Sequence, residues 1–301
     1  MDVSRKSVAW TIGELLQWTT AYFTRSGIDE ARLSAELLLA HSLNCSRMAL
    51  YTRFEQIPPA EHVAVFREMV KRRKDHTPVA YLIGKAWFYS LEFTVTPDVL
   101  IPRPDTETIV EQVIRLARMT PAWEAPEILD MCTGSGCIAI ALAKNLPTAR
   151  LTVSDISPAA LRIAEKNAAA HDLAARIRFL SGDLFEPVAA MSPPVKFHAI
   201  VCNPPYIVAN KIAELMPEVS QHEPKVALNG GADGLAFYRR LATHAPEYLL
   251  PDGALIVETA FDQSSDVQDI LLAQKDFHDS RIIRDAAAHP RCVLVRKSAA
   301  G

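Results

Sequence analysis

The chain has 301 residues, of which 49% are hydrophobic, so it can bury a large core in one domain or in two smaller ones. Its 32 basic and 35 acidic residues give a net charge of −3, which excludes a global positive field that would draw the protein to nucleic acid. Membrane-length apolar runs, a signal-peptide pattern and metal-ligand spacings are absent from the sequence, and the five cysteines form no CxxC pair. We therefore expect a cytoplasmic protein with reduced cysteines, no membrane association and no metal site.

The first part of the chain is expected to form a small helical domain over residues 1–77. Apolar residues recur at helical spacing in three stretches, 7–27, 28–44 and 60–76. The third stretch ends in a basic cluster, Lys71, Arg72, Arg73 and Lys74. Basic residues in a last turn complement the helix dipole, and a patch that docks a partner is the alternative interpretation.

The rest of the chain has the pattern of an α/β domain. Residues 78–103 alternate β-branched and aromatic side chains, which predicts a β-hairpin linker, and a helix is predicted over 103–119 with Pro104 at its start. Strand and helix patterns then alternate, which favours a mostly parallel, Rossmann-like sheet. The predicted strands lie near 127–131, 150–154, 176–181, 197–202, 254–258, 278–284 and 291–296.

The tetrapeptide Asn203-Pro204-Pro205-Tyr206 follows the apolar run 197–202, at the carboxyl end of a predicted buried strand. Ligands bind at that edge of open α/β sheets. The Asn203 side-chain oxygen and the Pro204 carbonyl can each accept an N–H, while Tyr206 offers a flat face with a polar tip. Such a loop suits a planar NH2 group, although Asn-Pro and Pro-Pro are also ordinary turn signals.

A glycine loop and two acidic residues complete a predicted crevice. Gly134 and Gly136 lie between a strand and a helix, and Asp155 ends the next strand, where it can accept from ribose hydroxyls. Asp183 follows the third strand and can accept from an adenine amino group. The loop and Asp155 fit a nicotinamide cofactor and S-adenosylmethionine equally well. Asp183, the loop after strand four and the lack of residues for hydride chemistry favour S-adenosylmethionine.

The sequence resembles the HemK-type N5-glutamine methyltransferases that modify peptide chain release factors. The resemblance covers nearly the whole chain, and its most specific part is "LIPRPDTE", "TGSG" and "NPPY" in that order. It implies a class I S-adenosylmethionine-dependent methyltransferase domain over 104–301. It also implies that the enzyme methylates the side-chain amide of the glutamine in a Gly-Gly-Gln loop.

The resemblance carries roles to particular residues. The cofactor would be bound by Thr133, Gly134, Ser135, Gly136, Cys137, Asp155, Asp183, Leu184 and Asn203. Leu184 departs from the family, which often has an aromatic residue there, and this departure puts adenine stacking at the position in doubt. The substrate glutamine would be bound by Asn203, Pro204, Pro205 and Tyr206, of which Asn203, Pro204 and Tyr206 are the predicted catalytic residues.

The catalysis expected of these residues is positioning, without a strong base. Glu223 and Glu258 are therefore interpreted as structural or cofactor-side residues. Release factors are the expected partners, and we expect a monomer that makes no direct contact with nucleic acid. Three alternatives stay open: an adenine-N6 methyltransferase of DNA or RNA, a ribosomal-protein glutamine methyltransferase and a non-catalytic adaptor.

Overall fold

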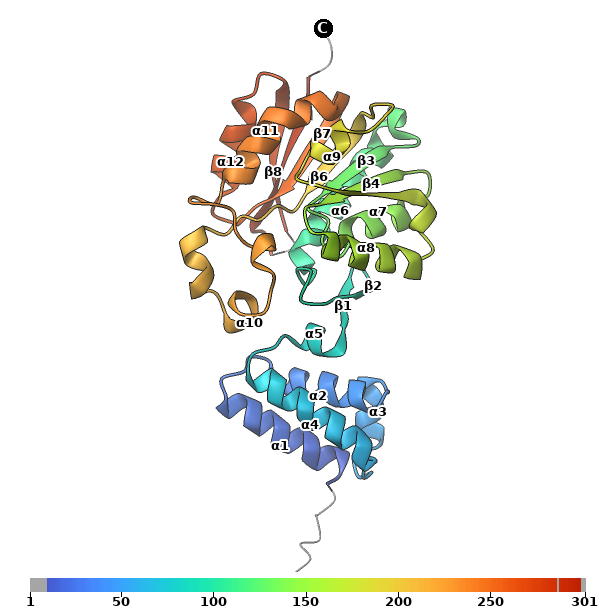
Figure 1. Cartoon of the computed structure of the whole chain (residues 1–301), viewed down its shortest axis with the longest axis vertical. Helices are drawn as coiled ribbons and strands as arrows, with labels where there is room; N and C mark the ends of the chain where they lie inside the picture. The colour runs from blue at the N-terminus through green and yellow to red at the C-terminus, as the bar shows by residue number, and fades with distance from the viewer. Residues whose placement is uncertain (1–9, 286, 299–301) are drawn as a thin grey trace, which may run out of the picture. The chain divides into compact units, whose positions relative to one another are not determined.

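The computed structural model describes residues 10–285 and 287–298 (Figure 1). They form two compact units, one ending at Gly84 and one beginning at Lys85. The start of the first predicted helix, residues 7–9, lies outside the described residues. Across the described ranges, no helix combines the length and apolar character that a membrane crossing requires.

The first unit is helical, as expected. Its described helices are α1 (Ile12–Arg25), α2 (Ala31–Ser42), α3 (Arg47–Thr52), α4 (Ala60–Lys74) and α5 (Val79–Ile83). Thr11 and Glu14 form a capping box that starts α1. The apolar faces of α1, α2 and α4 meet in one core around Leu16, Leu38 and Phe66. α3 was not predicted from the sequence, since six residues are too few to show a helical period.

The second unit begins with a hairpin, β1 (Lys85–Phe88) and β2 (Leu91–Thr94). It is shorter than the linker predicted over 78–103, since residues 79–83 of that range form α5 in the first unit. Its two turn residues, Tyr89 and Ser90, both have positive φ, as a type I′ turn requires. The Asn167 side chain accepts from the Thr94 N–H at 2.8 Å and donates to the Thr94 carbonyl at 3.0 Å. These bonds attach the hairpin to the helix that carries Asn167, α8 (Pro158–Ala170).

A seven-stranded sheet forms the centre of the second unit, in the order β5-β4-β3-β6-β7-β9-β8. The strands are β3 (Glu127–Met131), β4 (Arg150–Asp155), β5 (Ile177–Ser181), β6 (Phe197–Cys202), β7 (Leu249–Glu258), β8 (Phe277–Arg284) and β9 (Pro290–Lys297). β3 to β7 pair in parallel, whereas β9 runs antiparallel to both of its neighbours. The predicted α/β fold with a mostly parallel sheet is confirmed.

Helices cover both faces of the sheet (Figure 1). One face packs on α6 (Glu107–Met119), α7 (Cys137–Asn145) and α8, and the other on α9 (Glu186–Ala189), α11 (Ala236–Tyr248) and α12 (Ser264–Leu272). A short helix, α10 (Pro217–Ser220), lies in the segment between β6 and α11. Because both faces of the sheet are covered at its centre, β6 and residues 254–257 of β7 are almost continuously apolar.

Candidate functional site

A cavity of about 310 Å³ opens at the carboxyl ends of the parallel strands. The segments that follow β3, β4, β5 and β6 all contribute to its lining, together with residues 98–106 and 224–227. The strand order reverses between β3 and β6, which is where open α/β sheets bind their ligands. All of its lining residues belong to the second unit.

The glycine loop and Asp155 form one wall of this cavity. Gly134 has a φ of +55°, and its N–H donates to Asp155 Oδ2 at 2.9 Å. The Ser157 N–H donates to the other oxygen, Oδ1, at 2.9 Å. Burial raises the pKa of Asp155, while these backbone donors oppose the rise. Asp155 is thus an oriented acceptor beside a loop whose glycine leaves open space for a ligand.

Asp130, which the sequence analysis missed, supports the loop from inside the sheet. Its Oδ2 accepts from the Thr133 hydroxyl at 2.7 Å and from the Ala139 N–H at 3.2 Å. Complete burial raises the pKa of Asp130 to about 7, against these hydrogen bonds. An acidic residue inside an apolar strand has no sequence signature of this role, because its partners are set by the turn that follows.

Gly136 has a different role from Gly134. It lies at the N-terminus of α7 with a φ of +79°, and a Cβ there would lie 3.1 Å from the Ala164 Cβ of α8. Gly136 therefore allows two helices to approach closely and does not line the cavity.

The wall after β5 contains Asp183 and Leu184. Asp183 Oδ2 pairs with Arg240 Nη2 of α11 at 2.7 Å, so its charge is already partnered. Leu184 is buried, with only 5% of its surface exposed, and it contributes an apolar face to the cavity. Phe237, one turn before Arg240, supplies an aromatic ring in the same lining. Neither α11 residue was predicted from the sequence, because contact with the cavity depends on how that helix packs.

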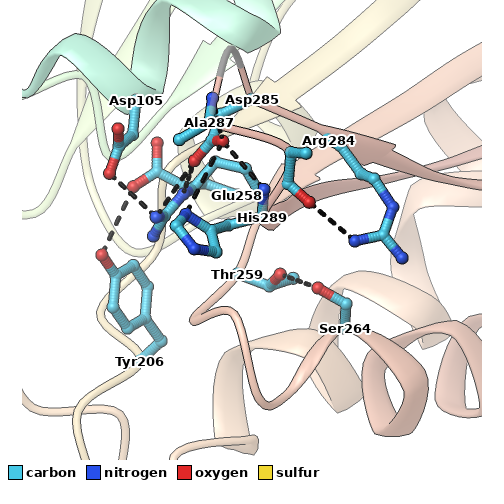
Figure 2. Close-up of polar contacts among 11 residues, drawn as sticks. Asp105, Tyr206, Glu258, Thr259, Ser264, Arg284, Asp285, Ala287 and His289 are labelled. Carbon is cyan, nitrogen blue, oxygen red and sulfur yellow. Dashed lines mark hydrogen bonds and ion pairs between the residues drawn. The ribbon is translucent and has the colours of Figure 1, made fainter.

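The loop after β6 presents Asn203 and Pro205 to the cavity. Asn203 Nδ2 donates to the Thr106 hydroxyl at 3.3 Å. Tyr206 points elsewhere: its hydroxyl donates to Glu258 Oε1 at 3.3 Å (Figure 2). Neither Pro204 nor Tyr206 lines the cavity as described.

Most of the predicted site residues therefore meet in one place. The cavity is lined by Thr133, Gly134, Ser135, Cys137, Asp155, Asp183, Leu184, Asn203 and Pro205. Gly136, Pro204 and Tyr206 are not part of this lining. The chemical roles assigned to all of these residues stay predictions. Among residues 10–285 and 287–298, no three His, Cys, Asp or Glu side chains gather as metal ligands would.

The lining suits a nucleoside ligand with a charged end. Asp155 is an oriented carboxylate for ribose hydroxyls, and Leu184 and Phe237 provide apolar and aromatic surface for a base. Gly134 leaves room for close approach of a ligand to the backbone. These residues fit S-adenosylmethionine.

Comparison with known families supports this interpretation over both units. Residues 14–84 match the PrmC N-terminal domain, and residues 114–279 match the methyltransferase small domain. The catalytic domain of hMettl16 has the same fold, with a TM-score of 0.54 at 15% sequence identity, over 70% of this chain and 76% of that one. At that identity the likeness concerns the fold alone.

Full-length relatives are considerably more similar. The chain is 43% identical to the release factor glutamine methyltransferase of Geobacter sulfurreducens, over 88% of this chain and 89% of the relative. It is 38% identical to that of Rhodopirellula baltica, over 99% of this chain and 100% of the relative. With these identities and the cavity described above, the chain belongs to the family of release factor glutamine methyltransferases, which are S-adenosylmethionine-dependent enzymes.

Proposed function

We propose that this enzyme methylates the side-chain amide nitrogen (N5) of the glutamine in the Gly-Gly-Gln loop of peptide chain release factors. One observation carries the proposal: Asn203, after β6, and the loop Thr133–Gly134, after the adjacent strand β3, line the same cavity. A group that can hold an amide thus lies beside the predicted cofactor site. The names of the curated relatives support the release factor as the substrate.

The chemistry assigned to the loop is the alignment of a weak nucleophile. The lone pair of an amide nitrogen is delocalised into its carbonyl. Asn203 Oδ1 and the Pro204 carbonyl would each accept one N–H of the substrate, leaving the lone pair directed at the methyl group. Alignment of this kind lowers the activation free energy by up to roughly 7–11 kcal/mol in the best intramolecular reactions.

The remaining roles follow from this arrangement. S-adenosylmethionine supplies the methyl group when bound, and the substrate nitrogen forms its new bond to carbon as the methyl–sulfur bond breaks. The product amide then loses its extra proton to water, so no protein base is required. The predicted packing of Tyr206 on the amide plane would require its ring to reach the cavity while its hydroxyl stays with Glu258.

The two units would divide recognition from chemistry. We assign the helical domain, residues 1–77, and the linker, residues 78–103, to contacts with the body of the release factor, and residues 104–301 to methyl transfer. Because one chain supplies the whole cavity lining, we propose that the monomer is active in the cytoplasm. The five free cysteines are consistent with that compartment.

The experiment supplies purified enzyme with radiolabelled S-adenosylmethionine and one of three acceptors: a release factor, the same factor with its loop glutamine changed to alanine, or duplex DNA. Label on the first acceptor alone is the expected result. Label on DNA would instead support an adenine-N6 methyltransferase. Label on both forms of the release factor would place the methylated residue outside the loop.

A further inference from the structure

Asn203 can act as proposed in only one of the two orientations of its side-chain amide. Its Oδ1 must face the cavity to accept from the substrate, so its Nδ2 must be satisfied on the other side. The structure supplies that partner, since Nδ2 donates to the Thr106 hydroxyl at 3.3 Å. Thr106 is buried and lies 97 residues earlier in the chain, at the end of the 3-10 turn Pro104–Thr106.

A hydroxyl alone does not fix the orientation of a neighbouring amide, because the hydroxyl can either donate or accept a hydrogen bond. If the Thr106 hydrogen pointed at Asn203, the hydroxyl would bind Oδ1, and Nδ2 would turn into the cavity. The cavity would then offer a donor to a substrate NH2 group that needs acceptors. The orientation of Asn203 therefore depends on where the hydrogen of Thr106 goes.

Glu258, at the end of β7, is positioned to take that hydrogen. The residue is 1% exposed, and its Oε1 accepts from the Tyr206 hydroxyl (Figure 2). Its Oε2 is buried without a partner in hydrogen-bond geometry, although the Thr106 hydroxyl is near enough to favour the charged carboxylate. A buried acceptor without a partner is costly, so a donor that can rotate toward it is stabilising.

We infer that Glu258 and Thr106 are positioning residues that fix the orientation of the Asn203 amide. An ionised Glu258 can only accept hydrogen bonds, so the Thr106 hydroxyl donates its hydrogen to the Glu258 carboxylate. The Thr106 oxygen is then left to accept from Asn203 Nδ2, and Oδ1 faces the cavity. This inference rests on the proposed function, because it concerns the presentation of Oδ1 to the substrate amide.

The neighbours of Glu258 determine when it is ionised. Burial raises its pKa to about 7, while Thr106, Arg291 and Tyr206 oppose the rise. The titratable and charged groups that face it come from the segment before α6, from α7, from the loop after β6, from α11 and from β9: Asp105, Cys137, Tyr206, Tyr238, Arg291 and Cys292. Below pH 7 Glu258 gains a proton that it can donate to Thr106, which can then donate to Asn203 Oδ1 and invert the amide.

The test uses the full chain and a release factor, with kcat, KM and the Kd of S-adenosylmethionine measured for each variant. Thr106→Val and Glu258→Gln should lower kcat about 10- to 100-fold, because the acceptor is misdirected. Their cofactor Kd should stay within about twofold of wild type. Thr106→Ser keeps the hydroxyl and should restore kcat to within about threefold. Thr108→Val removes a buried hydroxyl from the same segment and should leave all three constants unchanged.

The pH profile gives a second readout that a merely structural role would not move. The kcat of wild type should rise as the pH increases through about 7, and Glu258→Gln should abolish that rise. Asp130 also has a pKa of about 7, so the comparison with Glu258→Gln, and not the wild-type profile alone, isolates Glu258.

Several results would overturn the inference. These are a wild-type kcat in Thr106→Val, an equal loss of kcat and cofactor affinity, or a wild-type pH profile in Glu258→Gln. If Thr106→Val does not fold, the profile of Glu258→Gln decides alone. A wild-type enzyme that methylates no glutamine refutes the proposed function, whereas an active wild type with an equally active Thr106→Val refutes only this inference.

Discussion

Arg103 Nη2 lies 2.6 Å from Glu223 Oε2, and this contact joins two segments that are 120 residues apart. The Glu223 side chain is 1% exposed, and burial raises its pKa even though Arg103 lies beside it. Arg103 follows Pro102, and Glu223 precedes Pro224, so both ends of the ion pair adjoin residues that line the cavity. The pair therefore connects two segments of the cavity wall.

Removing Arg103 should destabilise the protein. In Arg103→Met, Glu223 stays buried without its cationic partner, and we expect a loss of about 1–3 kcal/mol in the free energy of unfolding. Urea denaturation at pH 7.5 or so measures the loss. The exposed pair Arg150–Glu127, at 3.5 Å, is the control, since Arg150→Met should change stability by less than about 0.5 kcal/mol. Equal effects of the two variants would contradict the structural role of Arg103.

Asp155 should contribute more to cofactor affinity than Asp183. In Asp155→Asn an amide NH2 would oppose the N–H of Gly134 or Ser157, so loop geometry and ribose contacts are both lost. We expect the Kd of S-adenosylmethionine to rise about 10- to 100-fold by calorimetry. Asp183→Asn should have a smaller effect, since Arg240 already partners that charge. A wild-type Kd in Asp155→Asn would contradict the assignment.

Two buried carboxyls should make the second unit less stable as the pH rises. Burial raises the pKa of Asp130 and of Glu258 from their ordinary values of 3.8 and 4.5 to about 7. Their neutral forms favour folding, so the contribution is fully present below pH 4 or so and is lost as the pH rises through about 7. Denaturation between pH 5 and 8 should show this fall, and Glu258→Gln should make it shallower. An equally steep fall in that variant would contradict the contribution of Glu258.

The helical unit should respond to pH in the opposite direction. The Glu36 side chain is 3% exposed and binds Arg32 at 2.6 Å, Arg47 at 2.5 Å and the Tyr51 hydroxyl. Although burial raises its pKa, these hydrogen bonds lower it to about 2. Its stabilisation is present above pH 4.5 or so and is lost as the pH falls toward 2. Glu36→Gln should therefore lower Tm at pH 7 and lose less stability on acidification, as followed by circular dichroism.

An aromatic cluster on the helical unit offers a test of release-factor recognition. Trp18 is 45% exposed, stacks on Tyr22 at 5.0 Å between ring centroids and contacts Trp10 edge-on at 5.8 Å. Trp18→Ala should raise KM for a whole release factor about tenfold but leave that for a short Gly-Gly-Gln peptide unchanged. Met48→Ala, at an exposed apolar residue outside this cluster, should raise neither KM. Equal effects of Trp18→Ala on both KM values would exclude a role of Trp18 in binding the body of the release factor.

The strands were predictable because their burial leaves a mark in the sequence. The run 197–202 forms β6, in which every residue except His198 is buried. β7 was predicted from 254 onward but begins at Leu249, because its exposed Pro251-Asp252 with Gly253 has the composition of a turn. The register between β6 and β7 is irregular at this point. A strand that contains such a bulge cannot be told from a loop by periodicity.

The candidate site was predictable where its residues follow strands and hidden where packing selects them. The glycine loop, Asp155 and Asn203 could be found because each lies at the carboxyl end of a predicted strand. The contact of Asn203 with Thr106, and that of Tyr206 with Glu258, join residues far apart in the sequence. No local pattern indicates such contacts, so the orientation of the loop could come only from the structure.

The most direct test of the central claim is to locate the transferred methyl group. A release factor treated with the enzyme and S-adenosylmethionine is digested and sequenced by tandem mass spectrometry, beside a sample treated with Asn203→Ala. The account predicts one methyl group on the side-chain nitrogen of the Gly-Gly-Gln glutamine with wild type, and at least about 100-fold less with the variant. Methylation at any other residue, or equal methylation by Asn203→Ala, would contradict it.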